Sequence, residues 1–216
     1  MSSSHIGNTL ADQSQFIEMF GDPLINDKGW ETALFSTLCT AIGDGLHGTP
    51  VYDDNGRYPF INGNNFREKK IVITPETRKV GKEMYDKYFI ELDETTVMLS
   101  INGTLGKTAL YQGETVILGK SACYSKVGPK LNREFVLALF MSDAFQQYMQ
   151  DNCTGTTIKN FGLKALRDYS MIIPPIKAQE RFVEFMQQCD KSKFAVQKSL
   201  EKAETLYKSL MQEYFG

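Results

Sequence analysis

The sequence contains little histidine and little cysteine. His5 and His47 are its only histidines, and no two cysteines lie closer than 30 residues apart. The four cysteines are Cys39, Cys123, Cys153 and Cys189. Zinc sites and disulfide frameworks usually take two of their residues from one short loop. We therefore predict no metal site and no disulfide, and we interpret the cysteines as reduced packing residues.

Long apolar runs are also absent. The longest run, FVLALFM at 135–141, is far shorter than the roughly 20 residues of a membrane-spanning helix. The opening MSSSHIGNTLADQSQ has neither the basic nor the apolar stretch of a secretory signal. We expect a cytoplasmic protein without a membrane partner. The chain of 216 residues, with 42% hydrophobic and 23% charged residues, predicts one globular domain plus an appendage, or two small domains.

Residues 30–130 alternate between short β-type segments and turns. The segments are YPFING, KIVIT, KYFIEL, TVMLSI, TALYQG, TVILG and CYSKV, separated by Gly, Asn, Asp and Pro. We predict a compact, curved sheet, mixed or antiparallel, followed by one helix from Arg133 to about Asn152. CTGTTIKNFGLKAL predicts a loop that leads into a short helical turn, and YSMIIPPI predicts a last β segment.

From Ala178 to Phe215 the chain contains neither Gly nor Pro, which predicts one long helix. At about 1.5 Å per residue its length is about 57 Å, more than a domain of this size covers. Ten of its positions follow heptad spacing, and all except Lys193 are apolar or aromatic. The nine are Phe182, Met186, Cys189, Val196, Leu200, Ala203, Tyr207, Leu210 and Tyr214. This spacing favours dimerisation through the nine residues; the alternative is a helix that folds onto its own domain.

The predicted fold class is therefore α+β. We expect an N-terminal helical segment at 1–21, a compact β-rich domain with a few short helices at 22–175, and a long coiled-coil helix at 176–216. The two ends also resemble each other, because SQFIEMFG at 14–21 and SLMQEYFG at 209–216 share Ser, Glu, Phe and Gly at an offset of 195 residues. This repeat suggests that the chain is one unit of a tandem duplication.

The net charge of −2 conceals two basic blocks. Residues 57–87 carry eight Lys or Arg and four acidic residues, and residues 120–167 carry seven and three. Both blocks also contain aromatic residues. They are compatible with a local phosphate-binding face on an otherwise acidic protein, although solvated surface loops would have the same composition.

The sequence contains partial matches to catalytic and nucleotide-binding motifs, but the residues around each match do not fit the motif. GDGLHG at 43–48 matches a dinucleotide fingerprint, but a turn follows it where a helix is required. NGTLGKT at 102–108 has two residues where a Walker A loop has four, and IIPPI lacks the Asn or Asp of an amino-methyltransferase loop. His47 is the only plausible histidine base, and no nucleophile elbow is present. We predict a protein without catalytic residues.

Six polar loops remain, and they are interleaved with basic residues. They are GDGLHGTP (43–50), FINGNNFREKK (60–70), TPETRKVGK (74–82), INGTLGKT (101–108), LGKSAC (118–123) and CTGTTIKN (153–160). Asn, Thr, Lys and Arg are the residues that bind base edges and phosphates. Ordinary hairpin turns would also contain Asn and Gly, so this composition leaves both interpretations open.

The order of these motifs resembles the specificity subunit of type I restriction–modification enzymes. The series runs GDGxHGTP, PFINGNNF, VMLSINGTLGKTAL, GKSACYSKV, CTGTTIKNFG and IIPPIKAQERF, and a long helix follows. The resemblance covers nearly the whole chain from about residue 14. In that family a full-length subunit has two target recognition domains, and each is followed by a long helix. The two helices pair antiparallel, set the distance between half-sites and dock methyltransferase subunits. This chain has one of each, as a half-length form would.

The resemblance implies that residues 22–175 are a target recognition domain that binds double-stranded DNA and has no catalytic role. A homodimer would read a bipartite, palindromic site and recruit the methyltransferase (modification) subunit, and a motor-nuclease subunit would join the complex. This chain would hold no cofactor, because S-adenosylmethionine is expected on the methyltransferase subunit. For base or phosphate contact we predict Asn64, Asn65, Asn102, Thr104, Lys107, Thr154, Thr156, Thr157, Lys159 and Asn160. As phosphate anchors we predict Arg67, Lys69, Lys70, Arg78, Lys79 and Lys120.

Three alternatives belong to other functional classes. A protein–protein adaptor would use the β domain to bind a protein loop and the helix to dimerise. An enzyme would use an unfamiliar site around His47, Asp44 and Asp53. A regulatory or anti-restriction half-subunit would occupy the methyltransferase without directing it to DNA.

Overall fold

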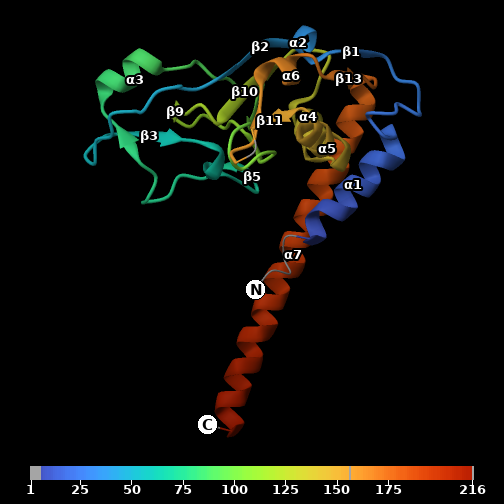
Figure 1. The fold of residues 1–216 in the computed structure, drawn as a ribbon. Coiled ribbons are helices and arrows are strands. Elements are labelled where there is room, and N and C mark those ends of the chain that lie inside the picture. Colours follow the sequence, from blue (N-terminus) through green and yellow to red (C-terminus); the bar gives the residue numbers. More distant parts are fainter. Residues whose placement is uncertain (1–5, 156, 216) are drawn as a thin grey trace.

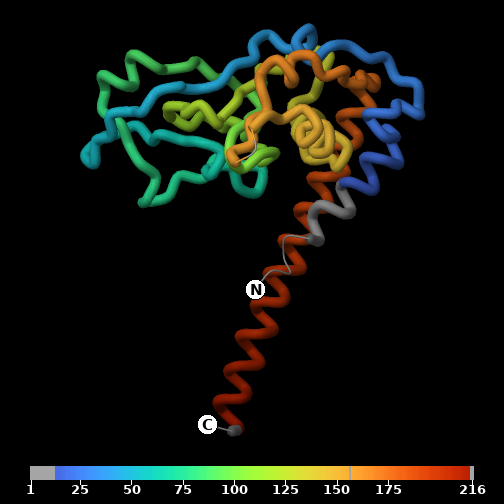
Figure 2. Tube along the Cα trace, in the orientation of Figure 1, coloured from blue at the N-terminus to red at the C-terminus, as the bar shows by residue number. Residues whose placement is uncertain are grey.

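The computed structural model describes residues 6–155 and 157–215, and the side chains of 13–155 and 157–214. A β-rich domain lies at one end of a long C-terminal helix, which continues well beyond it (Figures 1 and 2). This architecture confirms the predicted α+β fold class. Within the described ranges, no helix is both long and apolar enough to span a membrane.

The secondary structure follows this order along the chain. The elements are α1 (Ile6–Phe20), β1 (Thr32–Leu34), α2 (Phe35–Leu38), β2 (Cys39–Asp44), β3 (Tyr58–Ile61), the 3-10 helix η1 (Gly63–Asn65), β4 (Phe66–Arg67), β5 (Lys69–Ile71), β6 (Lys79–Val80), α3 (Lys82–Tyr88), β7 (Thr96–Ser100), β8 (Thr108–Leu110), β9 (Ile117–Leu118), β10 (Ala122–Val127), α4 (Arg133–Met141), α5 (Asp143–Asp151), β11 (Cys153–Thr154), β12 (Asn160–Phe161), α6 (Leu163–Arg167), β13 (Ser170–Ile172) and α7 (Ile176–Phe215).

A mixed six-stranded sheet forms the centre of the domain, in the order β2-β10-β7-β8-β5-β4. Its β5–β8 pair is parallel and the other neighbours are antiparallel. Every residue of β7 is buried. Because side chains alternate along a strand, Val97 and Leu99 face the core beneath α4, whereas Met98 faces a second apolar cluster on the opposite side. The sheet is thus covered on both faces at its centre.

Two predicted elements differ in the structure. The strand predicted for KYFIEL at 87–92 is wrong, because α3 ends at Tyr88 and the residues after it join no strand. Lys82 and Asp86 form an i,i+4 ion pair that favours helix in α3, which takes up the first two residues of this segment. The single helix predicted for 133–152 is divided at Ser142. Its hydroxyl accepts from the Phe145 amide, so it caps α5 where α4 ends.

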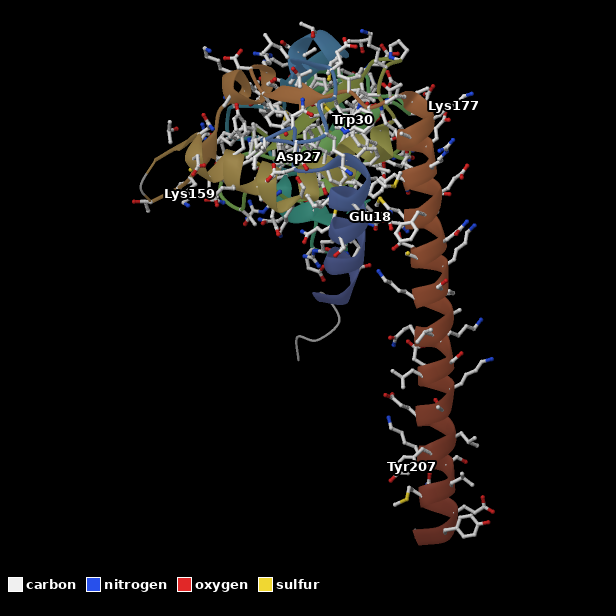
Figure 3. All side chains as sticks on the ribbon, turned by 90° about the vertical axis from the view of Figure 1, so that its right-hand side faces the viewer. Glu18, Asp27, Trp30, Lys159, Lys177 and Tyr207 are labelled. Carbon is white, nitrogen blue, oxygen red and sulfur yellow. The ribbon has the colours of Figure 1, made fainter. Side chains whose placement is uncertain are left out.

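Four phenylalanines attach α7 to the domain. Phe16 and Phe20 of α1 pack against Phe182 of α7 with ring centroids 5.5 Å apart in each case. Both also contact Phe135 of α4, at 5.6 and 5.0 Å. All four side chains are at most 2% exposed. Helix α1 lies antiparallel beside the first part of α7 (Figures 1 and 3), and Glu18 is labelled on α1 in Figure 3.

The heptad stripe of α7 divides into a buried and an exposed part. Phe182 and Met186 are buried within their own chain, against α1 and α4, and Cys189 is half-buried. The prediction that Phe182 and Met186 face a partner helix is therefore wrong, because heptad spacing does not distinguish a partner's helix from a helix of the same chain. The exposed members are Val196, Leu200, Ala203, Tyr207, Leu210 and Tyr214. Tyr207 lies on the part of α7 that extends beyond the domain (Figure 3).

We predict that Phe182→Ala lowers the free energy of unfolding by about 3–5 kcal/mol, the usual cost of removing a buried phenylalanine ring. Phe194→Ala is the matched control, because Phe194 lies on the same helix and is 72% exposed. The control should change stability by less than about 0.5 kcal/mol. Urea unfolding of both variants measures the difference. Equal stabilities would show that the aromatic cluster does not hold α7 to the domain.

Candidate nucleic-acid interface

The loop at 118–123 joins two other predicted loops. The Leu46 amide donates to the Leu118 carbonyl at 2.7 Å, and the Lys120 amide donates back to the Leu46 carbonyl at 3.0 Å. The Gly119 amide donates to the Ile61 carbonyl at 2.8 Å. Loops 43–50 and 60–70 are thereby fixed on either side of 118–123.

Two serines extend this network to the loop at 101–108. The Ser121 hydroxyl accepts from the Gly63 amide at 3.1 Å, and the Ser121 carbonyl accepts from the Ile101 amide at 3.1 Å. The buried Ser100 hydroxyl accepts from the Lys107 amide at 2.8 Å and closes the turn between β7 and β8. Three loops from different strands therefore lie around these serines.

The loop at 153–160 is a short hairpin that lies against 101–108. The Asn102 side-chain amide donates to the Asn160 side-chain oxygen at 3.0 Å. Two backbone hydrogen bonds reinforce this contact. The Gly103 amide donates to the Lys159 carbonyl at 3.1 Å, and the Phe161 amide donates to the Ile101 carbonyl at 2.8 Å. Gly103 has φ +74°, a conformation that favours glycine at this turn.

Asn65 connects the last loop, 74–82, to the others. Its side-chain oxygen accepts from the Asn62 amide at 3.0 Å, and its side-chain nitrogen donates to the Val72 carbonyl at 3.0 Å and to the Thr77 hydroxyl at 3.4 Å. The Phe60 amide also donates to the Arg78 carbonyl at 2.8 Å. All six predicted loops thus belong to one hydrogen-bonded surface.

Several cations on this surface lack an acidic partner. In the part of the chain that the structure describes, no carboxylate lies within ion-pair distance of Arg67, Lys70, Lys107 or Lys120. Such uncompensated charges attract phosphate groups. The Arg78 guanidinium instead lies 4.5 Å from the centre of the Tyr52 ring, which orients it.

The predicted contact residues are not equally accessible. Those exposed are Asn64, Arg67, Lys70, Arg78, Thr104, Lys120, Thr154, Thr157 and Lys159. Those partly buried are Asn65, Lys69, Lys79, Asn102, Lys107 and Asn160, and Thr156 lies outside the described residues. Figure 3 shows Lys159 at the edge of the domain that lies away from α7.

Some of the predicted residues have partners within the protein. The Lys159 ammonium donates to the Gln150 side chain at 2.6 Å, and Lys69 forms an ion pair with Asp190 of α7 at 3.4 Å. The Thr154 hydroxyl donates to the Asn160 carbonyl at 3.4 Å. These contacts hold the side chains in place, and the Lys69 contact also connects the β4–β5 turn to α7.

Sequence reasoning missed three residues that position these loops. Ser100 and Ser121 tie loops together, and the Gln146 side chain donates to the carbonyls of Gly106 and Phe140 at 3.2 and 2.6 Å. A polar residue at the end of the apolar strand TVMLS was a signal that could have identified Ser100. A single glutamine in a helix gives no comparable signal.

Part of the site predicted for the enzyme alternative is present in the structure. His47 Nε2 lies 2.7 Å from Asp44 Oδ2, and the His47 side chain is largely exposed. Asp53 instead accepts from the Asn55 amide at 2.9 Å and closes its own turn. Among the described residues, no group of three or more His, Cys, Asp or Glu side chains is arranged to hold a metal ion.

A family model matches most of this chain. The model of the type I restriction modification DNA specificity domain matches residues 28–204, which contain the β-rich domain and the larger part of α7. A search of curated proteins found no match.

Solved structures share the fold. The HsdS subunit from Thermoanaerobacter tengcongensis has a TM-score of 0.66 and 18% identity, with 95% of this chain and 49% of that chain covered. A chain from a structure on complex assembly and conformational transition of the type I R-M system gives 0.65 and 18%, covering 95% and 50%. The S subunit from M. genitalium gives 0.50 and 17%, covering 88% and 45%. This chain spans about half the length of these proteins.

The family match covers most of the chain and includes all six loops of the candidate interface. A DNA specificity domain recognises its site and carries out no catalytic step. The chain belongs to the family of type I restriction–modification DNA specificity domains.

Proposed function

We propose that this protein is a sequence-specific DNA-binding specificity subunit, and that the six joined loops form its DNA-binding surface. The observation that supports the proposal most directly is that hydrogen bonds connect these Asn-, Thr- and Lys-rich loops to one another in a domain of this family. Side chains that form such a surface before DNA arrives lose less conformational entropy on binding.

The accessibility of the side chains suggests how they divide the work. Asn64, Thr104 and Thr157 are exposed and have short polar side chains, which suits them to base edges. Arg67, Lys70 and Lys120 are exposed cations with no acidic partner among the described residues, which suits them to phosphates. Asn65 has both ends of its amide occupied and holds the loop that presents Asn64.

The proposed active form is a homodimer. Residues 22–175 would supply one recognition domain, whereas a bipartite site requires two. Two copies related by a two-fold axis would read a palindromic pair of half-sites, and the exposed stripe of α7 is the surface available for that pairing.

Methylation and cleavage belong to other subunits in this proposal. The α7 helices would dock methyltransferase subunits, which would bring S-adenosylmethionine, and a motor-nuclease subunit would join the assembly. This chain would supply DNA recognition and hold no cofactor of its own.

Co-expression with a methyltransferase subunit of the same system tests the proposal. Sequencing of the host DNA should reveal N6-methyladenine at one bipartite palindromic motif, and none when this chain is omitted. If the subunits form a complex but leave the DNA unmethylated, the chain is a regulator that occupies the methyltransferase. If no complex forms, the adaptor alternative gains support.

Lys120→Ala should weaken DNA binding across all sequences and reduce the slope of log K against log salt by about 0.9, the effect of one lost phosphate contact. Lys177→Ala is the control, because Lys177 is exposed at the start of α7 (Figure 3). Fluorescence anisotropy with labelled DNA at several salt concentrations measures both slopes. An unchanged slope for Lys120→Ala would remove this residue from the interface.

Neighbouring asparagines should show different defects. Asn65→Ala should lower the free energy of unfolding by about 1 kcal/mol, because it leaves the half-buried Asn62 amide and Val72 carbonyl without these partners. Asn64→Ala should unfold like the wild type and yet weaken specific DNA binding, since the Asn64 side chain is exposed. Thermal unfolding and anisotropy separate the two effects. Equal stability losses would contradict the assigned roles.

A further inference from the structure

The apolar stripe of α7 has two different neighbours along its length. Near Phe182 and Met186 it is covered by α1 and α4, and at Cys189 and Lys193 it is half-buried. From Val196 onward it is exposed, and Val196, Tyr207 and Tyr214 are 68%, 64% and 72% exposed. Helix α1 therefore occupies the part of the stripe that precedes the exposed part.

We propose that a second copy of this chain covers the exposed part only, in an antiparallel pair whose two-fold axis passes level with Thr205, and that α1 fixes this register. The inference rests on the homodimer of the proposed function and specifies how its two helices meet. Helix α1 prevents a longer overlap of the two α7 helices, because it already occupies the surface of α7 on which the partner helix would then lie.

The exposed stripe matches itself in this register. The facing pairs are Val196 with Tyr214, Leu200 with Leu210, and Ala203 with Tyr207. Each pair joins an a position to a d position, as antiparallel heptad packing requires, and each tyrosine faces a smaller residue. Leu206, which is 62% exposed beside the stripe, comes close to its own copy at the axis.

Shifts of one heptad fit less well. Moving the axis towards the domain would place the partner's Leu210 against Lys193 and its Tyr214 against Cys189, both half-buried. Among the stripe members from Val196 to Tyr214, moving it the other way would pair only Ala203 with Tyr214 and Tyr207 with Leu210. A full overlap of the heptad stripe would place Tyr214 on Phe182, which is 0% exposed and packs against Phe16 and Phe20.

The size of the stripe suits a reversible dimer. Its exposed part extends for about 27 Å at about 1.5 Å per residue. Covering it on both copies, together with Leu206 and Met211, would remove on the order of 1,000 Å² from water, near the lower limit for specific interfaces. The register also separates the two Phe182 residues by about 70 Å along the helices, whereas full overlap would separate them by about 48 Å.

Distances between nitroxide labels test the register. Lys191 and Gln212 are both exposed and occupy equivalent heptad positions on the outer side of α7. The component of the label-to-label distance perpendicular to the helices is therefore the same at both positions. With the axis at Thr205, the two labels of a dimer lie about 42 Å apart along the helix for Lys191→Cys and about 21 Å for Gln212→Cys. Full overlap exchanges these two values, and a parallel pair makes them equal.

Labelling requires few changes to the chain. Burial raises the pKa of Cys39 to about 12 and that of Cys123 still further, so neither thiol forms a reactive thiolate at neutral pH. Cys153→Ser and Cys189→Ser remove the remaining half-buried thiols. Double electron–electron resonance is then measured on full-length protein, and light scattering on the same samples reports its mass.

Distances along the helix of about 42 Å for Lys191→Cys and about 21 Å for Gln212→Cys support the register, whereas about 52 Å and about 10 Å would indicate the outward heptad shift and overturn it. The reverse order, or equal distances, overturns it while leaving the homodimer intact. A monomer in light scattering overturns the homodimer itself and this register with it. Leu200→Glu, on the stripe, should abolish the dipolar signal, whereas Phe194→Glu, on the opposite side of α7, should preserve it; loss of the signal in both variants would also count against the stripe.

Discussion

The packing of four phenylalanines at the start of α7 determines how the parts of this protein relate to one another. Phe16 and Phe20 come from α1, Phe135 from α4 and Phe182 from α7, so the cluster joins segments that lie far apart in the sequence. Because α4 packs on the central sheet, the cluster also fixes α7 relative to the loops that extend from that sheet. The direction of α7 relative to the loops of the candidate interface therefore depends on this apolar contact.

A buried amide strengthens this contact. Gln179 is fully buried; its side-chain nitrogen donates to the carbonyls of Lys130 and Pro174, and its oxygen accepts from the Asn132 amide. Asn132 in turn caps α4 through its own side chain. Aromatic packing is not directional, whereas these hydrogen bonds are, so Gln179 limits rotation of α7 about the cluster. The three hydrogen bonds of this amide offset the cost of removing it from water.

The sequence predicted the larger elements well because they depend on local patterns. The absence of Gly and Pro from Ile176 to Phe215 was enough to predict α7, and the β-branched and apolar residues of TVMLS between two turns were enough to predict β7. The strand predicted at 87–92 failed because Tyr, Phe and Ile favour strands on average, whereas α3, with its Lys82–Asp86 ion pair, extends to Tyr88 and the residues after it pair with no strand. Asn64 and Asn65 are identical neighbours, so their different roles follow only from the hydrogen bonds of the folded loop. Periodicity likewise identified the α7 stripe but not its neighbours, because α1 and a partner helix require the same heptad pattern.

The charge distribution fits a protein that must discriminate among DNA sequences. A strongly basic protein binds all DNA through phosphates, and this sequence-independent affinity competes with recognition of the target. Here the net charge is −2, and the cations that have no acidic partner in the described part of the chain lie on loops that also present Asn and Thr side chains. Few phosphate contacts would then position the domain, and a larger share of the binding energy would come from base edges. Because one such domain contributes few contacts, joining two of them through α7 would raise the affinity for a paired site far more than for an isolated half-site.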